Sequence, residues 1–395
     1  MLYYQIIKGI IMEKFSLIII LFAALITPLI TARFHIQRMP TAISEILMGI
    51  VIGKTGLNIA RPDTSVQYIA NLGVIILIFL GGMEIDFSLL EPKKDKTIYS
   101  PLGTSFTGFM TILFMSILLS GVLYLTGIFT DFVLAVILFS TIALGVIISL
   151  LKEVGLLQTN YGQTILLTSA FGEFIPLVAL TIYSAVQQRH YISVLGLPVI
   201  FIIAIILLHR FNRIYVFFDK IDKATTQLDI RLAFFLIFTL VTFAEQIGAE
   251  SILGAFLAGA VMKLLKPKPD TEDKLSSIGY GFFIPVFFIT TGVNLNLRTL
   301  FTNWDAVLLI PIFLMAFILS KAIVYFVFRK RFGRRYAAGA SIVTATTITL
   351  VLPILQVGRN LKLISMAQSG AITLAAIITC LVCPILFNKI LKTEE

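Results

Sequence analysis

The stretch Ser341-Ile-Val-Thr-Ala-Thr-Thr-Ile-Thr-Leu-Val-Leu-Pro353 decides the fold of this chain. Five hydroxyl side chains interrupt an apolar run that ends in a proline, a residue with no backbone N–H to donate. Non-helical backbone at membrane depth persists only where protein buries it or where it lines water. Together with a second hydroxyl-rich stretch at 139–149, the stretch predicts an interrupted membrane helix that is surrounded by other helices.

The composition of the whole chain agrees with a membrane setting. Its 395 residues are 58% hydrophobic and 13% charged, with a mean hydropathy of +0.99, whereas soluble domains have roughly a quarter of their residues charged. The net charge of +10 does not indicate a nucleic-acid partner, because the basic residues form short clusters between apolar runs. We expect an all-α polytopic protein whose main partner is the lipid bilayer.

The apolar runs predict about thirteen transmembrane helices when each crossing takes roughly 20 residues. With loops assigned alternately, 22 of the 31 Lys and Arg residues fall on one side, 8 on the other, and Lys321 inside a span. The positive-inside rule then predicts a plasma-membrane protein with its N-terminus outside and its C-terminus in the cytoplasm. No hydrophilic stretch is long enough for a soluble regulatory domain, so we expect residues 1–395 to form a single membrane transport unit. The expected spans lie near 14–32, 40–59, 65–87, 99–126, 130–151, 160–187, 191–217, 226–246, 249–265, 276–294, 303–328, 336–357 and 363–388.

A second interrupted span is expected at Phe139-Ser-Thr-Ile-Ala-Leu-Gly-Val-Ile-Ile-Ser149, where hydroxyls surround a glycine. Small residues also let ordinary helices pack closely, so either stretch alone carries little weight. The two stretches lie in the fifth and the twelfth expected spans, however, which are seven spans apart. Because seven is odd, the two spans cross the membrane in opposite directions. The pattern predicts inverted-topology repeats over about 14–187 and 226–388, joined by a linker helix over about 191–217, with a transport site where the two broken helices cross.

Two charged residues lie deep inside apolar spans. Glu173 sits between Gly172 and Pro176, and an acid at mid-depth costs at least ~2.5 kcal/mol, so it is a candidate ion or proton site. A structural hydrogen bond is the weaker interpretation, because glutamine would make one at less cost. Lys321 lies eight residues from the cations at 329–335, or ~12 Å along a helix, which is too far for comfortable snorkelling.

The two cysteines, Cys380 and Cys383, form a C-x-x-C in the last span. In an apolar helix this spacing is typical of two small buried side chains, and the surrounding sequence has no thioredoxin or metal-site pattern. We assign them no chemistry and expect no cofactor.

Four stretches resemble the second cation:proton antiporter family, which includes Kef-like proteins and bacterial sodium/proton exchangers. The resemblance covers almost the whole chain and implies a thirteen-helix protomer with a dimerisation domain and a mobile core, and hence a homodimer. It places Glu173 on the ion-binding acid, Lys321 on the core lysine, and 141–145 and 344–349 on the helix crossing. The stretches are Pro40-Thr-Ala-Ile-Ser-Glu-Ile-Leu-Met-Gly-Ile-Val-Ile-Gly53, Leu77-Ile-Phe-Leu-Gly-Gly-Met-Glu-Ile-Asp86, Leu253-Gly-Ala-Phe-Leu-Ala-Gly259 and Ile284-Pro-Val-Phe-Phe-Ile-Thr-Thr-Gly-Val293.

The chain departs from the family pattern at the acid. Gly172 precedes Glu173 where many sodium/proton exchangers have paired acids, and Glu replaces the more usual Asp. The twelfth span also lacks the Arg-Gly-Glu-like element that is common in relatives. A single carboxylate can hold one monovalent cation or one proton, which favours electroneutral one-for-one exchange.

These observations predict a monovalent cation/proton antiporter, and no enzyme. Glu173 would bind Na+ or K+ in alternation with H+, and Lys321 would pair with Glu173 when no cation is bound. Alternatives within transport are a ligand-gated potassium efflux system and a sodium-coupled symporter of an organic anion. An intramembrane enzyme is disfavoured, because the chain has no His-Glu-x-x-His and no paired membrane aspartates, and a structural scaffold would need neither charge. Candidate residues at the crossing are Ser140, Thr141, Gly145, Thr344, Thr346, Thr347 and Thr349.

Overall fold

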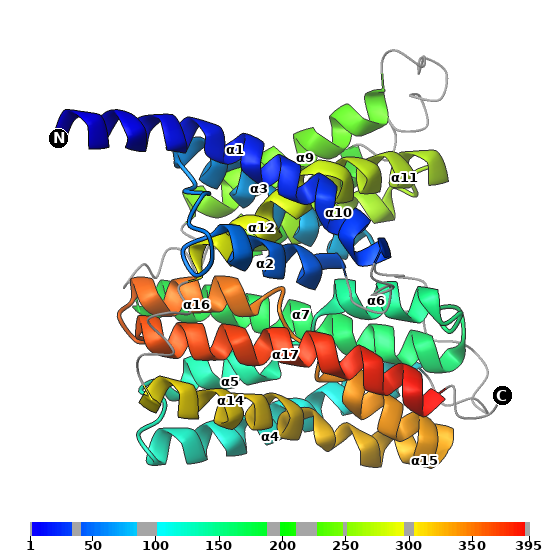
Figure 1. Ribbon diagram of the computed structural model, residues 1–395. Helices are drawn as coiled ribbons and strands as arrows, with labels where there is room; N and C mark the ends of the chain where they lie inside the picture. The colour runs from blue at the N-terminus through cyan, green and yellow to red at the C-terminus, as the bar shows by residue number, and fades with distance from the viewer. Residues whose placement is uncertain are drawn as a thin grey trace. The chain divides into compact units, whose positions relative to one another are not determined.

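The computed structural model contains helices and no strands in the residues that it describes (Figure 1). The all-α prediction is therefore confirmed. The described residues are 2–33, 41–84, 101–187, 198–210, 227–247, 251–295 and 304–391.

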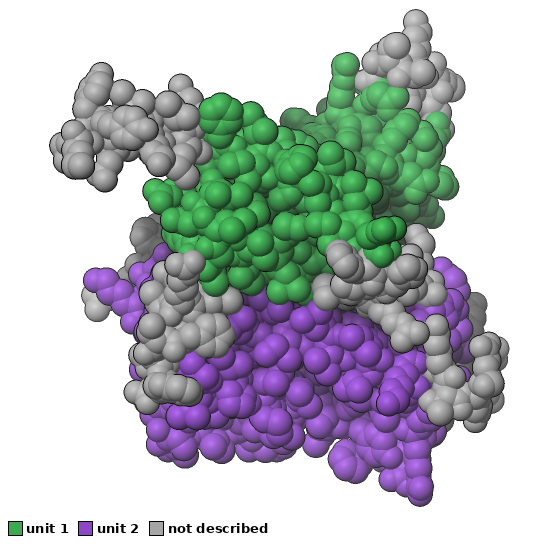
Figure 2. Space-filling view, viewed as in Figure 1, with its two compact units in different colours: residues 1–85, 188–296 green, residues 86–187, 297–395 purple. Residues whose placement is uncertain are grey.

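The chain forms two compact units (Figure 2). Unit 1 consists of Met1–Ile85 and Gln188–Asn296, and unit 2 consists of Asp86–Gln187 and Leu297–Glu395. Each unit takes one segment from each predicted repeat, so the compact units and the repeats divide the chain differently. The repeat boundaries near 14–187 and 226–388 remain a prediction.

Unit 1 holds the helices that open each predicted repeat. Part of the expected linker helix is present as Pro198–Arg210, and the rest of 191–217 lies outside the described residues. A π-helical turn, η2 (Gly279–Phe283), joins α11 to α12. The other helices are α1 (Leu2–Arg33), α2 (Thr41–Ile52), α3 (Thr64–Met83), α9 (Leu228–Gln246), α10 (Ser251–Leu264), α11 (Pro269–Ile278) and α12 (Ile284–Asn294).

Two glycine pairs bring the backbones of unit 1 helices into contact. A Cβ atom on Gly49 of α2 would lie 2.1 Å from the Ile289 carbonyl oxygen of α12, and one on Gly292 would lie 2.1 Å from that of Ile46. Only glycine permits so close an approach. In both cases the carbonyl belongs to the residue three positions before the partner glycine.

The same arrangement recurs between α3 and α10. A Cβ atom on Gly82 would lie 2.4 Å from the Phe256 carbonyl oxygen, and one on Gly259 would lie 2.0 Å from that of Phe79. The sequence step from 49 to 259 equals the step from 82 to 292, which is the spacing that the predicted internal repeats would give.

Unit 2 contains both spans that the sequence predicts to be interrupted. It also contains two other irregular places: α14 and α15 meet at a bend of 54°, and the helical backbone of α15 is interrupted at Gly333, where φ is +83°. The helices are α4 (Pro101–Leu125), α5 (Phe132–Ser140), α6 (Leu144–Glu153), α7 (Asn160–Gln187), α14 (Trp304–Ala322), α15 (Val324–Thr344), α16 (Val351–Asn360) and α17 (Met366–Leu391).

Six of the described helices are long and apolar enough to cross a membrane alone, or seven if the bent pair α14 and α15 is one span. Four further apolar helices are shorter, among them the interrupted segment Phe132–Ile148. A multi-pass protein is confirmed, while the number thirteen stays a prediction.

Candidate ion-binding site

The two predicted helix breaks exist and touch each other. The first separates α5 from α6 at residues 141–143, and the second separates α15 from α16 at residues 345–350. The Ala143 backbone N–H donates to the Thr346 carbonyl at 2.9 Å, and the hydroxyls of Thr141 and Thr347 are 2.7 Å apart. The predicted crossing of two partly unwound helices is therefore confirmed.

Glu173 lies on α7 beside this crossing. The Ile142 N–H in the first break donates to the Gly172 carbonyl at 3.0 Å, which places the neighbouring carboxylate at the break. The side chain is 3% exposed and faces the Leu144 backbone N–H and the Thr349 hydroxyl. Leu144 begins α6, and the partial positive charge at a helix N-terminus stabilises a carboxylate placed there.

The close packing of Ile142 explains why a glycine precedes the acid. A Cβ atom on Gly172 would lie 2.5 Å from both Cγ1 and Cδ1 of Ile142. An aspartate or asparagine at position 172 would therefore have to displace the first break. The departure from a paired acid follows from this contact, and Glu173 is the one carboxylate that the described residues place at the crossing.

Lys321 lies on α14 and is fully buried. Its Nζ donates to the Phe139 carbonyl at 2.6 Å, in the last turn of α5, and lies 5.4 Å from the centre of the Phe317 ring. A positive charge at a helix C-terminus offsets the partial negative charge of the carbonyls that end there. At each end of the first break, a charged side chain thus faces a helix end of opposite partial charge: Lys321 faces the C-terminus of α5, and Glu173 faces the N-terminus of α6.

The predicted pairing of Lys321 with Glu173 does not occur in this structure. Within the described part of the chain no ion pair joins them, because the Lys321 ammonium is held by the Phe139 carbonyl. The break at residues 141–143 leaves that carbonyl without its usual helical donor, and a buried carbonyl without a donor is costly.

The predicted hydroxyls divide into two groups. Ser140 donates to the Ile137 carbonyl at 2.9 Å and Thr344 to the Ala340 carbonyl at 2.8 Å, so both serve their own helices. The Oγ1 atoms of Thr346 and Thr349 and Oε2 of Glu173 are buried without a hydrogen-bond partner of suitable geometry, although Thr349 faces the carboxylate. These oxygens are the ones available to a ligand.

The remaining candidates have structural roles in this arrangement. The Thr141 hydroxyl donates to the Leu138 carbonyl at 2.8 Å and contacts Thr347. Gly145 lies in the first turn of α6, just after the break, and Pro353 lies in the first turn of α16, where a missing N–H breaks no helical bond.

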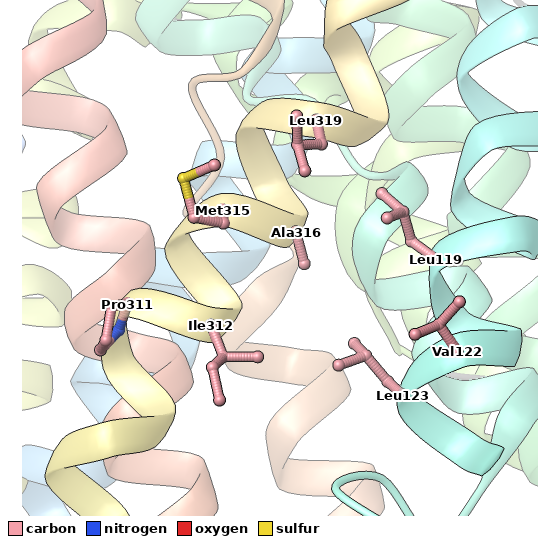
Figure 3. A pocket seen from close by; sticks show the side chains of 8 residues that line it. All are labelled: Leu119, Val122, Leu123, Pro311, Ile312, Met315, Ala316 and Leu319. Atoms are coloured by element: carbon pink, nitrogen blue, oxygen red, sulfur yellow. The ribbon is translucent and has the colours of Figure 1, made fainter. Parts of the chain in front are cut away.

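A groove of about 370 Å³ between α4 and α14 is not part of the site (Figure 3). All its lining side chains are apolar, and an ion needs oxygen ligands in place of its hydration shell. The lining residues are Leu119, Val122, Leu123, Pro311, Ile312, Met315, Ala316 and Leu319.

Sequence reasoning missed one residue at the crossing. Cys380 of α17 is fully buried, and its Sγ lies 3.5 Å from the Thr347 carbonyl oxygen. The C-x-x-C spacing gave no signal of this contact, since the acceptor lies in a break that only the fold brings close.

Comparison with known proteins agrees with this geometry. The family model described as "Sodium/hydrogen exchanger, transmembrane" matches residues 20–393. The chain belongs to the sodium/hydrogen exchanger family. The predicted resemblance is thereby confirmed.

The curated relatives of this chain include proteins that are named as antiporters. The chain is 36% identical over 392 residues to the "Putative Na(+)/H(+) antiporter YjbQ" of Bacillus subtilis, covering 96% of this chain and 63% of that protein. It is 26% identical to the "Na(+)/H(+) antiporter" of Enterococcus hirae, covering 95% of this chain and 97% of that protein. A "Glutathione-regulated potassium-efflux system protein" of Haemophilus influenzae is 24% identical, covering 93% of this chain and 59% of that protein.

A solved exchanger structure has the same fold. The sodium proton antiporter MjNhaP1 from Methanocaldococcus jannaschii matches with a TM-score of 0.62 at 14% identity, covering 95% of this chain and 96% of that one. At this identity the likeness supports the fold alone. The family is one of transporters.

Proposed function

We propose that the chain exchanges Na+ or K+ for H+ by alternating access, with the two ions competing for Glu173. The single observation that carries the proposal is the buried Oε2 of Glu173, which has no hydrogen-bond partner of suitable geometry although the Thr349 hydroxyl of the second break faces the carboxylate. Hard monovalent cations prefer oxygen ligands, and broken helices supply them at membrane depth. A cation bound by the carboxylate requires its deprotonation, so cation binding releases the proton.

One carboxylate at the crossing supports one-for-one exchange. Glu173 changes its charge by one when a proton replaces a monovalent cation, so the loaded site carries the same charge in both directions. Lys321 keeps its contact with Phe139 and takes no part in the exchange of charge. We therefore propose electroneutral antiport.

Na+ is the first cation to test, because several relatives are named Na+/H+ antiporters. K+ is the second, because one relative is named a potassium-efflux protein and another a Na(+)/H(+)-K(+) antiporter. The homodimer and the orientation with the C-terminus in the cytoplasm remain part of the proposal, supported by the family and by the distribution of Lys and Arg.

The test is cation-driven proton flux in proteoliposomes, with Na+, K+ or choline added and the membrane potential clamped. Glu173→Gln should abolish proton movement in response to Na+ and K+, whereas Glu173→Asp, which keeps a carboxylate, should retain coupled exchange at lower affinity. Wild-type exchange by Glu173→Gln would refute the role of the acid. Cation flux without proton movement would favour the potassium-efflux alternative.

Glu45→Gln is a matched comparison for this experiment. Glu45 of α2 is a buried carboxylate of unit 1 at 5% exposure, whereas the residues of the crossing belong to unit 2. The proposal expects this variant to exchange as the wild type does. Loss of coupling in Glu45→Gln would mean that exchange needs a second acid, and one-for-one stoichiometry would fail.

A further inference from the structure

Both thiols of the chain lie on α17, one helical turn apart, and they differ in their surroundings. Cys380 and Cys383 are free and buried, at 0% and 4% exposure. The Cys380 thiol donates to the Thr347 carbonyl across 3.5 Å. Cys383 has no hydrogen bond in the described part of the chain.

Thr347 occupies the second break, where the helix does not supply donors for its backbone carbonyl. Its hydroxyl contacts Thr141 at 2.7 Å, and the adjoining Thr346 carbonyl accepts the Ala143 N–H at 2.9 Å. Residues Thr346 and Thr347 are thus held by two groups from the first break, which contact the Thr346 carbonyl and the Thr347 hydroxyl, and by one thiol from α17, which contacts the Thr347 carbonyl. Inside the membrane no water replaces a lost hydrogen bond to a carbonyl, so each of these contacts restricts rotation of the backbone.

We propose that Cys380 is a positioning residue for cation binding, acting through the Thr347 carbonyl. With this carbonyl held, the segment that follows has a fixed direction, and the Thr349 hydroxyl stays beside Glu173. Without the hydrogen bond from Cys380, the peptide of the Thr347 carbonyl can rotate, and the oxygens that would bind the cation no longer point toward one place. The inference rests on the proposed function of Glu173 and extends it to α17, the helix that carries Cys380.

Serine and alanine replacements separate this role from simple packing. If the thiol acts as a donor, Cys380→Ser retains a donor. The Na+ concentration that gives half-maximal flux should then stay near the wild-type value. Cys380→Ala loses the donor and raises half-saturation about fivefold, which corresponds to about 1 kcal/mol for one hydrogen bond, with the maximal rate kept. If Cys380 only fills space, the order reverses, because alanine leaves a small void and serine buries a hydroxyl in an apolar place.

Cys383→Ala and Cys383→Ser are the matched controls on the same helix. Both should leave Na+ half-saturation unchanged. Because the chain has two cysteines, infrared difference spectra can report each thiol separately. The S–H stretching band lost in Cys380→Ala should lie lower than the band lost in Cys383→Ala, as expected of a hydrogen-bonded thiol.

The experiment measures Na+-driven proton flux against Na+ concentration for these four variants and for Glu173→Gln. Unchanged half-saturation in Cys380→Ala, or a weaker Cys380→Ser, would overturn the positioning role while leaving the proposed function intact if Glu173→Gln is inactive. Persisting exchange in Glu173→Gln would instead refute the proposed function itself.

Discussion

Adding one methyl group at Gly172 should force the first helix break away from α7. The new Cβ atom would meet Cγ1 and Cδ1 of Ile142 at 2.5 Å and its Cβ at 2.9 Å. Overpacking of this kind costs about 1–3 kcal/mol, while alanine in place of glycine inside a helix returns about 0.5–1 kcal/mol. We expect Gly172→Ala to lower the free energy of unfolding by about 1–2 kcal/mol and to weaken Na+ binding, because Ile142 belongs to the break.

Thermal unfolding in detergent and Na+-driven proton flux measure the two effects. Gly103→Ala is the matched control, because Gly103 lies exposed on α4 with nothing within 4 Å of a new Cβ atom. This variant should unfold at the wild-type temperature or slightly above it. Equal melting of Gly172→Ala and Gly103→Ala would show that the contact with Ile142 does not limit position 172.

A double-mutant cycle tests the same contact directly. Ile142 is fully buried, so Ile142→Ala alone should cost about 2–5 kcal/mol. It also removes Cγ1 and Cδ1, the two Ile142 atoms that would lie 2.5 Å from the new methyl group of Gly172→Ala, and leaves only the Cβ contact at 2.9 Å. The double variant should therefore be more stable than the sum of the single losses predicts, by more than about 1 kcal/mol. Strict additivity would refute the steric argument.

Three further predictions concern the charges and glycines of the fold. Lys321→Met keeps an unbranched side chain that ends where the ammonium would begin, and it leaves the buried Phe139 carbonyl without its donor, so the melting temperature should fall by the equivalent of about 1–3 kcal/mol; an unchanged melting temperature would show that the ammonium does not stabilise the end of α5. Gly172→Asp should fold poorly and gain no second coupled proton, and a well-folded variant whose exchange becomes dependent on membrane potential would contradict this. Gly259→Leu should abolish folding, because a Cβ atom there lies 2.0 Å from the Phe79 carbonyl oxygen, and wild-type yield of membrane-inserted protein would count against the close helix contact.

The two helix breaks could be predicted because the residues of these two spans are unusual for a membrane helix. Hydroxyls gathered around Gly145 and before Pro353 have no reason to lie in a lipid-facing helix. Which hydroxyls are free could not be predicted, because Ser140 and Thr344 bond the carbonyls of their own preceding turn. That choice depends on side-chain rotamers, which residue spacing does not determine.

The two buried charges were found from sequence, but their relation was not. Glu173 and Lys321 were expected to attract each other as the two ions inside the membrane. In the structure each lies at a different end of the first break, where the partial charge of a half-helix is the nearer partner. A sequence shows that a charge is buried, and only the fold shows which backbone group compensates it.

Calorimetry of Na+ binding tests the central claim most directly. The number of protons released per Na+ bound follows from titrations in buffers of different ionisation enthalpy, repeated across pH. A single shared carboxylate predicts a maximum of one proton per Na+, and no Na+-linked release in Glu173→Gln. A maximum near two, or release that persists in Glu173→Gln, would contradict the account.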